Sequence, residues 1–114
     1  MDYKVIISPR AVADLRDIVL YISPDRPQAA QCMGTGLLDR IRMLETFPFA
    51  GKIVEEFDNP AIRELVLPPY RIVYRIDKRQ KIIGIARFWH GSRGVLNTLQ
   101  LNEPGSAFVV KNQT

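Results

Sequence analysis

The first half of the chain has one short apolar segment and then two stretches in which hydrophobic residues recur with the period of a helix. Residues 3–7 (YKVII) are apolar and β-branched, which favours a strand. Ser8 and Pro9 are typical of a helix start, and Ser23-Pro24 predicts its end. The charged residues of this helix are expected on the side away from the apolar stripe: Asp14, Arg16 and Asp17.

A second helix is predicted to begin near Pro27 and to end before Pro48. The connection between the two helices is short, so they are expected to pack antiparallel. Gly34 and Gly36 lie inside the second helix, where each costs about 1 kcal/mol against alanine. They indicate either a close approach of another element or a break in the helix.

After residue 48 the hydrophobic period changes from 3.6 to 2. Three strands are predicted, at Ile62–Leu67, Tyr70–Asp77 and Lys81–His90, and their short connections make them antiparallel neighbours. Alternation in the middle strand predicts an apolar face covered by the helices and an opposite face that carries arginines. The chain therefore predicts an α+β fold, with an N-terminal strand, an antiparallel helix hairpin and an antiparallel three-strand meander forming a two-layer sandwich.

Composition narrows the class of protein. A length of 114 residues fits a single domain, and no apolar run approaches the ~20 residues that a membrane span needs. One cysteine, Cys32, is expected to be a buried apolar residue of a cytoplasmic protein. With one histidine and one cysteine, no metal site is predicted, and no motif indicates a cofactor.

The positive charge is concentrated in residues 62–93, which carry eight Lys and Arg against two acidic residues, a balance of +6. Such a block favours an anionic partner, either nucleic acid or an acidic protein segment. Guanidinium groups bind phosphate or carboxylate, and aromatic rings stack on bases or pack against a peptide. The candidate partner-binding residues are Arg63, Arg71, Arg75, Arg87, Trp89 and Arg93.

Four segments resemble the RelE/ParE superfamily of toxins from type II toxin–antitoxin modules. They are SPRAVADLRDIVLYI (8–22), LETFPFAGKIVEEF (44–57), IRELVLPPYRIVYRID (62–77) and IARFWHGSR (85–93). The resemblance implies a growth-arresting domain over residues 1–93, with 94–114 as a C-terminal extension. It also implies inhibition by a cognate antitoxin, whose C-terminal segment is expected to be acidic. Relatives of this kind are often called plasmid stabilisation proteins.

The superfamily has two branches, and each implies a different target. In the branch that cuts mRNA on the ribosome, Arg71 matches a phosphate-binding arginine, Arg87 lies on the neighbouring strand, and His90 is the candidate acid or base. The other branch inhibits DNA gyrase without catalytic chemistry of its own. The acidic segment Glu55–Asp58 and the HGSR ending favour the gyrase branch. A nuclease and a non-toxic antitoxin-binding module remain the alternatives.

Overall fold

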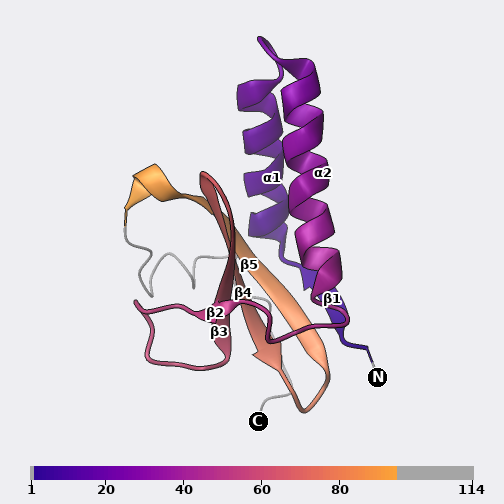
Figure 1. The fold of residues 1–114 in the computed structure, drawn as a ribbon, viewed down its shortest axis with the longest axis vertical. Coiled ribbons are helices and arrows are strands. Elements are labelled where there is room, and N and C mark those ends of the chain that lie inside the picture. Colours follow the sequence, from indigo (N-terminus) through magenta and orange to yellow (C-terminus); the bar gives the residue numbers. More distant parts are fainter. Residues whose placement is uncertain (1, 95–114) are drawn as a thin grey trace.

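The computed structural model describes residues 2–94, and within that range it has the α+β architecture that the sequence predicts (Figure 1). The elements are β1 (Lys4–Ile7), α1 (Pro9–Ile22), α2 (Pro27–Met43), β2 (Lys52–Ile53), β3 (Ile62–Leu67), β4 (Tyr70–Asp77), β5 (Ile82–His90) and the short 3-10 turn η1 (Gly91–Arg93). The predicted C-terminal extension, apart from Gly94, lies outside the described residues.

The strands form one sheet in the order β1-β5-β4-β3-β2. The meander β3-β4-β5 is antiparallel as predicted, with a cis peptide bond between Pro68 and Pro69 at the first turn. The first strand joins the sheet beside β5 and runs parallel to it. The two-residue strand β2, which pairs with β3, was not predicted, because so short a segment carries no periodic signal.

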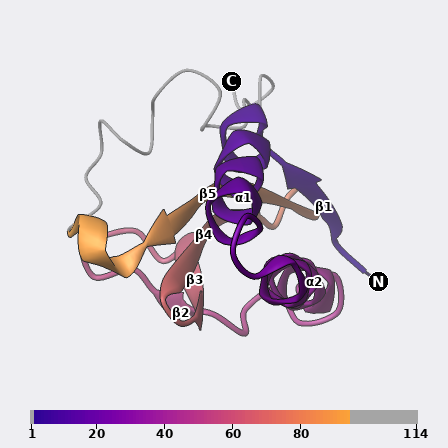
Figure 2. The same cartoon turned by 90° about the horizontal axis from the view of Figure 1, so that it is seen from above.

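The helices form the expected antiparallel pair, which packs against the sheet and extends beyond one end of it (Figures 1 and 2). Ser8 caps α1, since its hydroxyl accepts a hydrogen bond from the Ala11 amide and donates one to the Ala86 carbonyl. The helix α2 continues through both glycines. A Cβ on Gly36 would lie 3.1 Å from Leu67 Cδ2 of β3, so Gly36 permits a close helix–sheet contact.

Each face of the sheet carries a core. The larger core lies between the helices and one face and includes Leu37, Ile72 and Phe88. The opposite face, expected to display arginines, also carries a second core made by Val54, Phe57, Ile62, Val73, Ala86 and Trp89. Residues 54–57 therefore cover part of the face that the alternation of β4 assigned to charged side chains.

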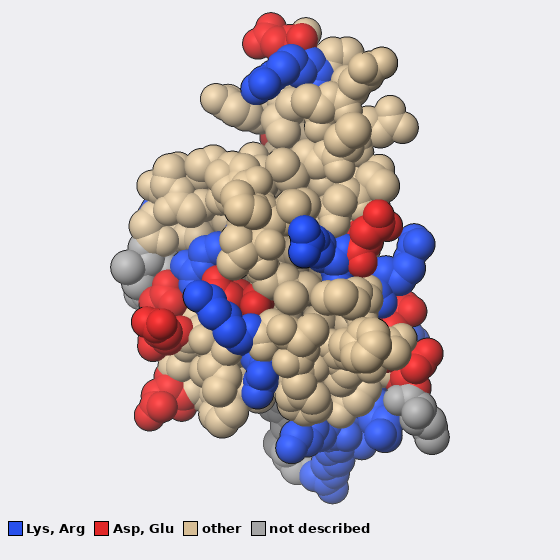
Figure 3. Space-filling model, viewed as in Figure 1, with Lys and Arg blue, Asp and Glu red and all other residues tan. Residues whose placement is uncertain are grey.

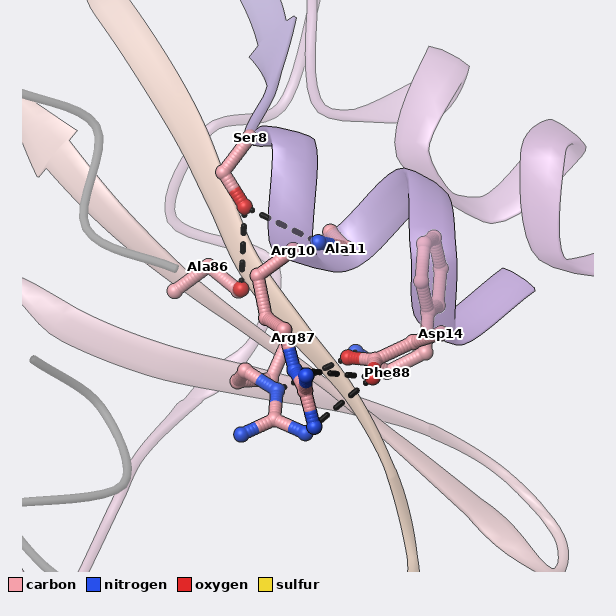
Figure 4. A network of polar contacts seen from close by, with 7 residues as sticks. All are labelled: Ser8, Arg10, Ala11, Asp14, Ala86, Arg87 and Phe88. Carbon is pink, nitrogen blue, oxygen red and sulfur yellow. Dashed lines mark hydrogen bonds and ion pairs between the residues drawn. The ribbon is translucent and has the colours of Figure 1, made fainter. Parts of the chain in front are cut away.

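The connection between α1 and β5 is a buried ion pair (Figure 4). The strand β1 ends at Ile7, opposite Ile85, so the edge of β5 beyond that point has no partner strand. Asp14 of α1 takes its place. Its Oδ2 accepts hydrogen bonds from Phe88 N at 3.0 Å and from Arg87 Nε at 2.8 Å, while Oδ1 accepts one from Arg87 Nη2 at 3.1 Å.

Two expectations for single residues were wrong. Asp14 was placed on the polar side of α1, but it is buried, because the helix crosses an open strand edge that needs an acceptor. Cys32 is exposed rather than buried, since it lies on the side of α2 that faces away from the sheet and α1. Among residues 2–94, no helix has both the length and the hydropathy required to span a bilayer.

We expect Asp14→Ala to lower the free energy of unfolding by about 3–5 kcal/mol, because it leaves a buried guanidinium without its carboxylate. Asp14→Asn, which keeps an acceptor for Phe88 N, should cost less. Asp17→Ala, an exposed change on the same helix, should stay within about 0.5 kcal/mol. Urea denaturation of the three variants measures these values, and equal stability of the Asp14 and Asp17 variants would contradict the role of the pair.

The glycines offer a second test of the packing. A Cβ at Gly34 would meet Val19 Cγ2 at an ordinary 3.6 Å, so Gly34→Ala should raise stability by about 0.5–1 kcal/mol through helix propensity. A Cβ at Gly51 would lie 2.6 Å from both Glu64 O and Tyr74 Oη, so Gly51→Ala should cost about 1–3 kcal/mol. Thermal melts measure whether the melting temperature rises in Gly34→Ala and falls in Gly51→Ala, as expected.

Candidate functional site

The arginines of residues 62–93 do not form one continuous basic face, and Arg71 is the clearest example. It lies near the start of β4, where its Nε donates to Glu64 Oε1 at 2.5 Å. Its two terminal nitrogens donate to Glu56 at 2.9 and 3.1 Å, a bidentate contact. Burial lowers the pKa of Arg71, but the hydrogen bonds and charges of Glu56 and Glu64 outweigh it and raise the pKa above its ordinary value. Arg71 is thus held by two carboxylates.

A groove of about 690 Å³ surrounds Arg71. Its charged lining consists of Lys52, Glu55, Glu56, Glu64 and Arg71, a balance of −1. A groove of this sign repels phosphate, and an anion that approached Arg71 would have to compete with two carboxylates already in contact with it. The acidic segment that carries Glu56 is therefore part of the site.

That segment is positioned through Tyr74 of β4. The phenol donates to the Pro48 carbonyl at 3.0 Å and accepts from the Gly51 amide at 2.9 Å. Burial raises the pKa of the Tyr74 phenol, with the hydrogen bond from Gly51 and the charge of Arg63 acting in the opposite direction. The neutral hydroxyl can therefore act as both donor and acceptor, and it ties residues 48–51 to the sheet just before the acidic residues.

Arg87 and Trp89, which the sequence suggests as partner-binding residues, do not lie at the surface. Both side chains are fully buried, Arg87 against Asp14 and Trp89 in the second core. The Trp89 ring lies 5.1 Å from the Arg87 guanidinium and 4.2 Å from that of Arg93, and its Nε1 donates to the Gly94 carbonyl. Strand alternation identified their face of the sheet, but residues distant in sequence cover it.

His90 has a local structural role. It precedes η1, and its Nδ1 accepts a hydrogen bond from the Ser92 amide at 3.0 Å, with Ser92 Oγ at 2.7 Å. The ring also packs edge-on against Tyr70, with 5.0 Å between centroids. Because Nδ1 accepts a hydrogen bond from the backbone, only Nε2 is left for proton transfer.

The remaining predicted residues are Arg63, Arg75 and Arg93. Arg93 is exposed at η1, whereas Arg63 and Arg75 lie at the other end of β3 and β4, beside the turn at 78–80. Arg63 and Arg75 thus line the same groove, apart from Arg71, Arg87 and His90. Asp14 was not identified as a site residue, because its partner Arg87 is 73 positions away. Glu55 or Glu56 was considered only as a distant partner of His90, and the pairing of Glu56 with Arg71 was not predicted. No group of three or more His, Cys, Asp or Glu side chains among residues 2–94 is placed to hold a metal ion.

Comparison with solved structures places this arrangement in a known class. The ParDE toxin–antitoxin system of P. aeruginosa superposes with a TM-score of 0.64 at 21% identity, covering 77% of this chain and 95% of that one. The RelBE2 toxin–antitoxin complex of Mycobacterium tuberculosis gives 0.57 at 21% identity, covering 79% and 99%. A mutant of the E. coli toxin RelE in the free state gives 0.59 at 15% identity, covering 82% and 88%. The fold is that of RelE/ParE superfamily toxins.

A family match makes the assignment more specific. The model of the family described as "ParE toxin of type II toxin-antitoxin system, parDE" matches residues 5–95. The chain therefore belongs to the ParE toxin family of type II toxin–antitoxin systems, and the resemblance seen in the sequence is confirmed. Among curated protein sequences, no significant match to the chain is found.

The contacts of Arg71 with Glu56 and Glu64 lead to a prediction about the stability of Arg71 variants. Arg71→Ala should lower the free energy of unfolding by about 1–3 kcal/mol, because it leaves the buried Glu64 without its cation. Arg71→Leu combined with Glu64→Leu should recover most of that loss, since no buried charge remains. Arg79→Ala, at an exposed turn, should stay within about 0.5 kcal/mol.

Urea denaturation measures the three variants. If Arg71→Ala proves as stable as the wild type, the ion pairs of Arg71 with Glu56 and Glu64 do not contribute to the free energy of unfolding. Arg71 could then exchange these partners for a ligand. If Arg71→Ala is destabilised as expected, lost activity in this variant alone does not identify Arg71 as a catalytic residue.

Proposed function

We propose that this toxin arrests growth by inhibiting DNA gyrase, with no catalytic chemistry of its own. The observation that carries the proposal is the bidentate pairing of Arg71 with Glu56 and its second contact with Glu64. Cleavage of RNA by 2′-hydroxyl attack needs cations that stabilise the charge developing on the phosphate. Here the candidate cation, Arg71, is paired with two glutamates, and the charged residues that line its groove have a net charge of −1.

The two other candidates for nuclease chemistry support the same choice. Arg87 is fully buried and paired with Asp14, so it does not reach a substrate in this conformation. His90 uses Nδ1 to hold η1, which is a structural role sufficient to explain its position. The match to the ParE family over residues 5–95 agrees with the gyrase branch.

The toxin is proposed to be neutralised by a cognate antitoxin through an acidic segment, and to act in the cytoplasm. Two of the structural neighbours carry toxin–antitoxin systems in their names, ParDE and RelBE2, which supports a partner of this kind. Residues 1–93 are proposed as the toxin domain and residues 94–114 as its extension. A role in plasmid stabilisation follows from the family resemblance.

A supercoiling assay tests the gyrase proposal. Purified toxin added to gyrase, relaxed plasmid and ATP should abolish supercoiling or accumulate cleaved plasmid. The control variant is His90→Asn, which keeps an acceptor able to cap η1 but cannot exchange a proton near neutral pH. It should inhibit as strongly as the wild type.

Full gyrase activity, from protein that arrests growth in cells, would contradict the proposal. If ribosome-bound mRNA were then cleaved and His90→Asn abolished the cleavage, the nuclease alternative would hold. A chain that binds its antitoxin but causes no growth arrest would be a non-toxic antitoxin-binding module.

A further inference from the structure

A second groove lies at the end of β4 opposite to Arg71. Its volume is about 620 Å³, and it is formed by Phe49, the segment Asn59–Ala61, Arg63 of β3, and β4 with the turn that follows it. The polypeptide that leads from α2 to β3 forms one wall and the 78–80 turn forms the other. No sequence pattern predicts this groove, because folding brings its two walls together from separate parts of the chain.

The charge of this groove is the opposite of that around Arg71. Its lining carries Arg63, Arg75, Lys78 and Arg79 against Asp77, a balance of +3. Within residues 2–94, none of these four cations forms an ion pair with a carboxylate. In Figure 3 basic side chains gather at the lower end of the molecule. Four cations that pair with no carboxylate of residues 2–94 therefore line one groove.

Arg63 is held in the groove by neutral groups. Its Nε donates to the Pro60 carbonyl at 3.1 Å, and its Nη1 donates to the carbonyls of Gly51 at 3.1 Å and Phe49 at 3.4 Å. These bonds fix the guanidinium in position but leave its charge uncompensated. A fixed cation costs less entropy on binding an anion than a mobile one does.

Phe49 shows which class of anion fits. The residue is 43% exposed, and both the Arg63 guanidinium and the Lys78 ammonium lie close to its ring, at 5.1 and 5.6 Å from the centroid. A nucleic-acid base that stacked on this ring would have to compete with the two cations. Carboxylates meet no such competition, since they pair with the same cations while an adjacent apolar side chain contacts the ring edge.

We propose that this groove is the docking site for an acidic segment of the antitoxin. The inference rests on the proposed function, which requires a protein partner that binds the free toxin tightly, and it names the surface that recognises that partner. The segment would place carboxylates against Arg75, Lys78 and Arg79 and an apolar side chain against Phe49. The Arg71 groove, with its negative balance, is not the place where such a segment binds.

The test compares two variants that remove the same charge. Lys78→Ala with Arg79→Ala removes two exposed cations of the groove, whereas Arg16→Ala with Arg40→Ala removes two exposed cations of the helices. The antitoxin is the protein whose co-expression relieves growth arrest by the wild-type toxin. Its Kd for each purified toxin is measured by fluorescence anisotropy, beside a labelled deca-glutamate peptide and a ten-nucleotide single-stranded DNA.

The groove variant is expected to bind both the antitoxin and the deca-glutamate peptide about tenfold more weakly than the wild type, and to need more antitoxin for rescue. The helix variant should stay within about twofold. Equal losses in both variants would overturn the proposal in favour of a general charge effect. Tighter binding of the DNA than of the peptide, lost in the groove variant alone, would also overturn it and make the groove a nucleic-acid site.

The gyrase assay separates this inference from the proposed function. The groove variant, Lys78→Ala with Arg79→Ala, should inhibit supercoiling as the wild type does, since its substitutions affect antitoxin recognition. If it loses gyrase inhibition but keeps antitoxin affinity, the groove contacts the target and the docking proposal is overturned. If the wild type does not inhibit gyrase while antitoxin binding still depends on the groove, the proposed function fails and the docking site stands.

Discussion

The architecture depends on the contact between Asp14 and the last residues of β5. The strand β1 covers only the first half of the β5 edge, so the amide of Phe88 has no partner strand, and the guanidinium of Arg87 beside it is buried. A single carboxylate in the second turn of α1 accepts hydrogen bonds from both groups. The same contact sets the position of α1 relative to the sheet and removes Arg87 from the surface (Figure 4).

Neutralisation of arginines by carboxylates from other elements decides which surface can bind an anion. Asp14 of α1 pairs with Arg87, while Glu56 from the segment before β3 and Glu64 of β3 pair with Arg71. The block of residues 62–93 keeps its balance of +6 in the sequence, yet its uncompensated charge gathers around Arg63 and the 78–80 turn. The charged residues that line the groove around Arg71 sum to −1, which is the observation behind the proposal that this toxin acts by binding.

Local patterns predicted most of the fold correctly. The Ser8-Pro9 start of α1, the helix pair and the three antiparallel strands agree with the structure within a residue or a few. Each depends on signals from neighbouring residues, namely a cap, a proline or a regular alternation. The sequence did not reveal the burial of Asp14, Arg87 and Trp89, because distant segments surround these residues, and it did not reveal the exposure of Cys32.

The sequence by itself determined most of the secondary structure, the α+β class, the family and the excess of positive charge in residues 62–93. Those properties are local or additive, so they can be derived without knowing which segments meet. Only the tertiary structure decided which arginines are neutralised and which are not. The carboxylate that pairs with an arginine can be as far as 73 positions away along the chain. The tertiary structure likewise decided where the basic groove lies, since a groove exists only when its two walls are brought together by folding.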